Sequence, residues 1–173
     1  MSARVERKYM AHYLDTTFSY VPGVAISHTP SWYRLGEDLE EYNIELNPNI
    51  EIQKNWLGDD IILHDGYEMT AEASPFYVYK NDDLHQKLFA IMRDLKEGAA
   101  CYTLSLEVRL WANITVRGTS GFNAIMRPCY VVPTSTGGDT SGVQIPFTVY
   151  YLNTFMEYGA FVPDGSGSGT FTY

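Results

Sequence analysis

Residues 81–112 read NDDLHQKLFAIMRDLKEGAACYTLSLEVRLWA and contain the two clearest patterns in the chain. In the first half, apolar residues recur at the spacing that places them on one face of a helix. These residues are Leu84, Leu88, Ile91, Met92 and Leu95. Asn81 is suited to cap the start of such a helix, and Gly98 is suited to end it. The pattern therefore predicts an amphipathic helix over residues 82–97.

The second half of this stretch changes to a period of two. Its apolar residues alternate with polar ones and are Tyr102, Leu104, Leu106, Val108 and Leu110. Strict alternation is typical of a β-strand with one buried face. Because no other stretch carries a long helical pattern, we expect a mainly β domain with one flanking α-helix.

The composition of the whole chain fits one β-rich domain. At 173 residues the chain can bury a sizeable core, and its 14 tyrosines favour pleated, partly buried surfaces. The net charge of −9 argues against a basic face that binds nucleic acid. No stretch approaches the ~20 apolar residues that span a bilayer, and no signal peptide is visible, so we expect no membrane association.

The first 40 residues have weak periodicity and are interrupted by Pro22, Gly23 and Pro30. We expect an extended N-terminal arm with short strands over residues 1–40. Its many apolar side chains either cover the edge of the chain's own sheet or lie on a neighbouring copy. Residues 41–173 then form the single β-domain.

Two strand-like segments, residues 41–53 and 67–74, place carboxylates on one face without basic partners. Asn47 and Pro48 are expected to interrupt the first segment. A row of carboxylates is either a solvated sheet face or a functional one. The loop between the segments carries Trp56 and Leu57, which either fold onto the core or anchor a partner.

The remaining C-terminal half reads as strands and turns. We expect a loop over residues 113–123, a strand over 124–133 and a flexible hairpin tip over 134–142. A further strand follows over residues 143–151. The chain then ends in a strand pair around a glycine-rich turn.

No local motif for catalysis or metal binding is present in the sequence. The histidines lie too far apart for a typical zinc site, and they are His12, His28, His64 and His85. Cys101 and Cys129 match no metal motif and are expected to be buried thiols, with a disulfide as the alternative. We therefore expect no enzyme activity, no cofactor and no metal site.

Four segments together resemble the tail tube protein, or major tail protein, of long-tailed bacteriophages. They are the helix within 82–96, the strand 102–111, the segment QIPFTVYY at 144–151 and the ending over 159–171. The resemblance implies a β-sandwich or half-barrel of the phage tail tube type with one flanking helix. It further implies hexameric rings that stack into a tube, through which DNA passes from the capsid into the host cell.

The resemblance also assigns expected roles to individual residues. The carboxylates expected to face the lumen and repel DNA phosphates are Glu45, Glu51, Glu68, Glu72 and Glu107. The residues expected to contact neighbouring copies are Trp32, Trp56, Leu57, Phe89, Gly137 and Gly138. Further expected partners are the tail terminator, tape measure and distal tail proteins. The protein would be made in the host bacterial cytoplasm and reside in the virion tail.

Three other functions are compatible with the residues. The inner tube of a contractile tail or of a tail-like injection device shares the tube fold but would need a surrounding sheath. A carbohydrate-binding β-sandwich could stack its aromatic side chains on sugar rings. An enzyme would need a pocket with convergent polar groups, which sequence alone does not reveal.

Overall fold

The computed structural model describes residues 2–36, 39, 41–153 and 155–173. Within these residues the protein is mainly β with one α-helix, α1 (Asp83–Arg93), which confirms the predicted fold class. Two short 3₁₀-helices, η1 (Arg7–Tyr9) and η2 (Gly98–Cys101), precede the strands β1 and β7.

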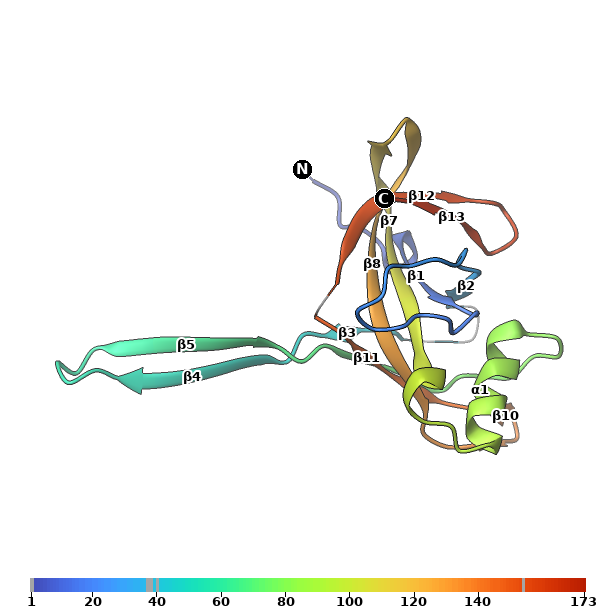
Figure 1. The fold of residues 1–173 in the computed structure, drawn as a ribbon, viewed down its shortest axis with the longest axis horizontal. Helices are drawn as coiled ribbons and strands as arrows, with labels where there is room; N and C mark the ends of the chain where they lie inside the picture. Colours follow the sequence, from blue (N-terminus) through green and yellow to red (C-terminus); the bar gives the residue numbers. More distant parts are fainter. Residues whose placement is uncertain (1, 37–38, 40, 154) are drawn as a thin grey trace.

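A nine-stranded antiparallel sheet forms the body of the molecule (Figure 1). Its main path runs, in spatial order, through β2 (Trp32–Leu35), β1 (Met10–Asp15), β7 (Tyr102–Val116), β8 (Thr119–Pro133), β11 (Phe147–Tyr151), β6 (Thr70–Ala73) and β3 (Ile44–Glu45). β8 also pairs with β12 (Glu157–Pro163), which in turn pairs with β13 (Gly169–Thr172). Two separate hairpins complete the structure: β4 (Pro48–Lys54) with β5 (Asp60–Tyr67), and β9 (Gly137–Asp139) with β10 (Gly142–Gln144).

Hydrophobic cores cover both faces of the large sheet. Along β1, Tyr13 packs into one core and Leu14 into the other, because successive strand residues point to opposite faces. Leu84 and Leu88 of α1 belong to the first core, and Phe161 of β12 belongs to the second. The strands in the middle of the sheet are therefore buried from two sides.

β7 extends further than predicted and buries more of its side chains. Thr103 and Ser105, which the alternation placed outward, are buried and donate hydrogen bonds to the carbonyls of Asp15 and Arg127 at 2.6 Å and 2.8 Å. The prediction of a loop over residues 113–123 is wrong. β7 continues to a tight turn at Arg117 and Gly118, with φ of +48° and +81°, and β8 begins directly after it.

α1 forms where its apolar stripe predicts, but it is shorter at both ends. The N-cap is Asp82 rather than Asn81, and its carboxylate accepts hydrogen bonds from the amides of Leu84 and His85. The helix ends at Arg93 because the backbone turns left-handed at Leu95, with φ of +48°. The amides of Leu95 and Lys96 then close a Schellman motif on the carbonyls of Met92 and Ile91.

β1 and β2 of the N-terminal segment are strands of the large sheet. β1 lies between β2 and β7, so its side chains cover an edge of the chain's own sheet. The buried carboxylate of Asp15 fixes the following loop. Its oxygens accept the amides of Thr17 and Ser31 at 3.0 Å and lie 2.7 Å from His28 Nε2.

The strand predicted over residues 41–53 divides in two at Asn47, where φ is +43°. β3 stays in the large sheet, whereas β4 leaves it and pairs only with β5. The resulting β4–β5 ribbon (residues 48–67) projects from the body on the side away from α1 (Figure 1). Every residue of β4 is exposed, so the prediction of a half-buried strand is wrong for this part.

The left-handed Leu95 provides a test of the helix ending. Replacing Leu95 by glycine should raise the free energy of unfolding by about 1 kcal/mol, because an L-residue pays a penalty in this conformation that glycine does not. The Leu95 side chain is 85% exposed, so little packing is lost. Leu95→Ala is the matched control, and urea unfolding is the measurement. Equal stability of the glycine and alanine variants would contradict this account of the helix end.

Candidate assembly surface

The tip of the β4–β5 ribbon is a hydrogen-bonded turn. The amide of Gly58 donates to the carbonyl of Asn55 at 3.0 Å, and the amide of Asn55 donates to the carbonyl of Asp59 at 2.9 Å. The Asn55 Oδ1 accepts the amides of Leu57 and Asp59. With Gly58 at φ +89°, this is a three-residue hairpin loop closed by a glycine bulge. These hydrogen bonds hold the backbone of Trp56 and Leu57 at the end of the ribbon.

Apolar side chains cover the ribbon without any contact to the two cores. Trp56 is 95% exposed and Leu57 is 71% exposed, so the expectation that they fold onto the core is wrong. The exposed aliphatic residues behind the tip are Ile50, Ile52, Ile61, Ile62 and Leu63. An isolated two-stranded ribbon is marginally stable in water, and contiguous exposed apolar surface marks sites of interaction. Contact of Trp56 and Leu57 with a partner stays a prediction.

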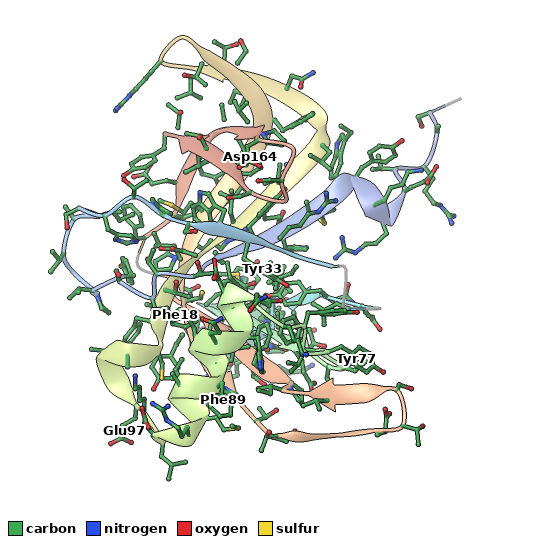
Figure 2. All side chains as sticks on the ribbon, turned by 90° about the vertical axis from the view of Figure 1, so that its right-hand side faces the viewer. Phe18, Tyr33, Tyr77, Phe89, Glu97 and Asp164 are labelled. Carbon is green, nitrogen blue, oxygen red and sulfur yellow. The ribbon has the colours of Figure 1, made fainter. Side chains whose placement is uncertain are left out.

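The other residues expected at contacts between copies differ in position. Trp32 is 4% exposed and lies in the core beside Tyr13, so it is not available to a neighbour and this prediction is wrong. Phe89 is 44% exposed on α1, which faces the viewer in Figure 2. Gly137 and Gly138 are exposed in the β9–β10 hairpin. Contacts with neighbouring copies through Phe89, Gly137 and Gly138 stay predictions.

The structure brings two of the predicted carboxylates together. Glu45 of β3 pairs with Thr70 of β6, so its side chain lies on the same face as Thr70 and Glu72. Together with Glu41, Asn43 and Ser74, Glu45 and Glu72 line a shallow pocket of about 360 Å³. Glu68 precedes Thr70 at the base of the ribbon and is exposed. The described residues that line this pocket include no lysine or arginine.

The remaining two carboxylates lie elsewhere. Glu51 projects from the β4–β5 ribbon, which is a separate sheet, and accepts a hydrogen bond from Gln53 Nε2 at 2.9 Å. Glu107 is largely buried and lies 3.3 Å from Arg127 and 3.9 Å from Arg109. Because this pairing neutralises its charge, Glu107 does not supply the phosphate repulsion predicted for it.

A row of tyrosines continues the acidic face across the sheet, and the sequence analysis did not identify it. Tyr102, Tyr130 and Tyr150 lie directly opposite one another on β7, β8 and β11, and Tyr150 in turn lies opposite Thr70. The rings of Tyr102 and Tyr130 meet edge to face, with centroids 4.9 Å apart. The row depends on strand register, so no local sequence signal could have revealed it.

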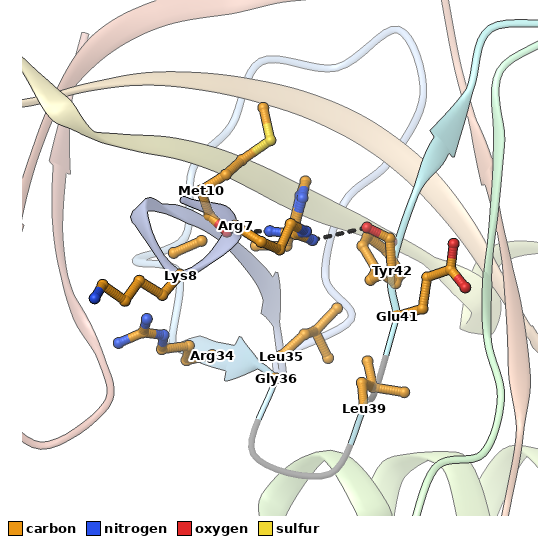
Figure 3. A pocket seen from close by; sticks show the side chains of 11 residues that line it. Arg7, Lys8, Met10, Arg34, Leu35, Gly36, Leu39, Glu41 and Tyr42 are labelled. Atoms are coloured by element: carbon orange, nitrogen blue, oxygen red, sulfur yellow. Dashed lines mark hydrogen bonds between the residues drawn. The ribbon is translucent and has the colours of Figure 1, made fainter. Parts of the chain in front are cut away.

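A second pocket, of about 310 Å³, lies between η1 and the end of β2 (Figure 3). Arg7 crosses it and donates hydrogen bonds to the carbonyls of Met10 and Tyr42. His12 lies against the Tyr42 ring, with centroids 4.9 Å apart. Since backbone carbonyls accept the hydrogen bonds of the Arg7 guanidinium, Arg7 connects η1 to residue 42 across this pocket.

Burial shifts the pKa values of the histidine and tyrosine side chains near this pocket. Burial, together with the nearby Arg7 and Arg127 guanidinium groups, lowers the pKa of His12 from 6.5 to about 3. Burial also raises the pKa values of the Tyr42 and Tyr151 hydroxyls, whose oxygens lie 2.8 Å apart. Neutral imidazole and neutral hydroxyls are what a packed interior requires.

Metal ligands do not gather in the part of the chain that the structure describes, where no group of three or more histidine, cysteine, aspartate or glutamate side chains could hold an ion. Cys101 and Cys129 are free and buried, as predicted. Among the described residues, no helix is long and apolar enough to cross a membrane.

Comparison with known proteins gives little further information. No protein-family model matches the chain, and no curated protein matches it. Among solved structures, a chain in the cryo-EM structure of the anti-feeding prophage (AFP) baseplate, six-fold symmetrised, is similar over 92% of this chain and 98% of that chain. The TM-score is 0.45 and the sequence identity is 9%, a weak likeness that assigns no role to any residue.

The lowered pKa of His12 predicts a pH-dependent stability. The unfolded chain takes up a proton on this histidine below about pH 6.5, whereas the folded chain does so only near pH 3. The free energy of unfolding should therefore fall as the pH drops through this window, by at most about 1.4 kcal/mol per pH unit from His12. Urea unfolding of the wild type and His12→Phe between these pH values measures the difference. Parallel curves for the two proteins would contradict the prediction.

Proposed function

We propose that this protein is the structural subunit of a bacteriophage tail tube, which assembles with copies of itself into stacked, hexameric rings around a channel for DNA. The observation that carries the proposal is the β4–β5 ribbon with its exposed Trp56. An exposed tryptophan in a hydrogen-bonded turn is typical of an interaction hot spot.

The ribbon supports contact between copies for a second reason. Its strands pair only with each other, so the outer edge of each leaves backbone groups open to another chain. An exposed, apolar edge promotes aggregation of a free subunit, but in a subunit that assembles the same edge can pair with a neighbouring copy. A contact between two different surfaces of the same chain repeats from copy to copy and generates rings or filaments.

The acidic and aromatic face supports the role of a channel wall. Glu45, Glu68 and Glu72 place negative charge beside the tyrosine row, on the face of β6 opposite the core that contains Ala71 and Ala73. A wall that repels phosphate lets DNA slide without sticking, whereas a binding groove would carry the opposite charge. We assign this face to the lumen.

Several finer assignments belong to the same proposal. The tail terminator, tape measure and distal tail proteins are the proposed further partners, and no catalytic role is proposed. An inner tube of a contractile tail would use the same surfaces and add a sheath. The tyrosine row also favours a second candidate, a carbohydrate-binding domain, because its Tyr150 is 48% exposed and aromatic rings can stack on sugars. A glycan screen of the free protein distinguishes that candidate.

Light scattering across a concentration series, with negative-stain electron microscopy of the same fractions, tests the assembly. Rings or tubes with an open lumen are the expected result. A monomer at every concentration that binds glycans would overturn the proposal in favour of the carbohydrate-binding domain.

Substitution of Trp56 by alanine should separate assembly from folding. Loss of a hot-spot tryptophan should weaken association by about 2 kcal/mol, roughly thirtyfold, while the free energy of unfolding of the subunit changes by less than about 0.5 kcal/mol. Trp32→Ala is the matched control, because the same change in the core should cost about 3–5 kcal/mol of folding stability. Equal effects of Trp56→Ala on folding and on assembly would count against the proposal.

Reversal of charge at Glu72 tests the lumen assignment. Tubes built from Glu72→Lys should retain DNA at about 50 mM salt and release it at about 200 mM, because six or more lysines per ring would then contact phosphates. Asp139→Lys changes the net charge equally but lies in the exposed β9–β10 hairpin, which is a sheet separate from β6. DNA that co-sediments with both variants to the same extent would refute the assignment.

A further inference from the structure

We infer that the tip of the β4–β5 ribbon docks into the cleft between β8 and β12 of a second copy of this chain. This inference rests on the proposed self-assembly and names the surface that receives the ribbon. The cleft, here called the β8–β12 cleft, is lined by residues 113–115, 120–122 and 161–163.

The cleft opens because two paired strands diverge. β12 pairs with β8 from Glu157 opposite Met126 to Phe161 opposite Phe122, after which Val162 and Pro163 pair with β13 alone. Gly121 lies in the cleft, and a Cβ there would stand 2.6 Å from the Phe161 carbonyl oxygen. The absence of a side chain at Gly121 therefore lets β12 approach β8 closely just before the two separate.

The size and chemistry of the cleft match those of the ribbon tip. Its volume is about 570 Å³, within the ~300–1,000 Å³ range of pockets that bind drug-sized groups. Ile114, Phe122 and Val162 give it an apolar lining. An indole ring and an isobutyl group, as in Trp56 and Leu57, can fill such a space and remove the exposed apolar surface of both partners from water.

Charge favours the same docking. The tip carries Asp59, while the neighbouring Asp60 is paired with Lys54, and the exposed turn beyond the cleft carries Arg117. Asp164, the acidic residue next to the cleft, is exposed, and its Oδ1 accepts the amide of Ser166 at 2.8 Å and the hydroxyl of Ser166 at 2.7 Å within its own turn. Arg117 is the cation that the docked tip would meet at the rim of the cleft.

The occupant is a second copy, because the ribbon does not reach the cleft of its own chain. Figure 1 shows β4 and β5 running straight away from the sheet, whereas β7 and β8 continue in another direction to their turn. The two strands pair without a shift from Lys54 opposite Asp60 to Ile50 opposite His64, and the register shift lies at the base of the ribbon, between Pro48 and Ile50. The part of the ribbon that carries the tip therefore has no break at which to fold back. Each copy thus offers one tip and one cleft. When the tip of one copy docks into the cleft of the next, the cleft of the first copy and the tip of the second stay free for further copies.

Cysteine cross-linking between two differently tagged chains tests the docking. Leu57→Cys is mixed with Val162→Cys, and disulfide formation between the two chains is followed on non-reducing gels. The native cysteines are buried at 1% and 0% exposure, so the introduced thiols react first. Docking should raise the yield about tenfold over mixtures with Val24→Cys or Leu95→Cys, because a disulfide needs Cα atoms within about 7 Å. Val24 lines another apolar pocket and Leu95 lies beyond α1.

A charge exchange keeps the test independent of thiol chemistry. Arg117→Asp should slow assembly, and Asp59→Arg in the same chain should restore part of the lost rate. Tubes that form without the Leu57–Val162 cross-link, or with faster cross-linking to Val24→Cys, would overturn the docking site and leave the proposed function intact. Absence of any association between wild-type copies would overturn both.

Discussion

The antiparallel ladder between β7 and β8 is the interaction on which the rest of the structure depends. It runs from Tyr102 opposite Tyr130 to Val116 opposite Thr119, with one register shift between Arg109 and Asn113. β1 pairs with the free edge of β7, while β11 and β12 share the free edge of β8. Because two strands attach to successive parts of one edge, the sheet divides at that point, and the two cores form on opposite faces of one ladder.

Close approach of backbone to backbone makes the second core possible. A Cβ at Gly159 would lie 2.2 Å from the Thr172 carbonyl oxygen, and one at Gly169 would lie 2.4 Å from the Phe161 ring. Glycine at these positions lets β13 pair with β12 while the Phe161 ring packs beneath, 4.7 Å from the ring of Tyr13. The glycine-rich ending of the chain is therefore a packing requirement of the strand pair, in addition to a turn signal.

Periodicity in the sequence locates strands and helices but does not say what covers them. α1 and β7 were predictable because each buries one regular stripe. β1 was not, because the run from Met10 to Asp15 is buried on both faces and shows no alternation. β4 alternates as β7 does, yet it is exposed throughout, since no other segment packs on it. The acidic face was half predictable: the outward direction of Glu72 follows from alternation, but its meeting with Glu45 and the tyrosine row requires strand register.

The exposed ribbon and the net charge of −9 act against each other in a free subunit. An apolar edge favours pairing with any neighbouring strand, whereas like charge on every copy opposes close approach. Charged side chains on the ribbon, among them Glu51 and the ion pair of Lys54 with Asp60, make unspecific pairing along its length costly. Attraction is concentrated instead at Trp56 and Leu57, where the turn fixes the geometry. In the proposed tube, this combination favours association through the tip over unspecific pairing along the strands.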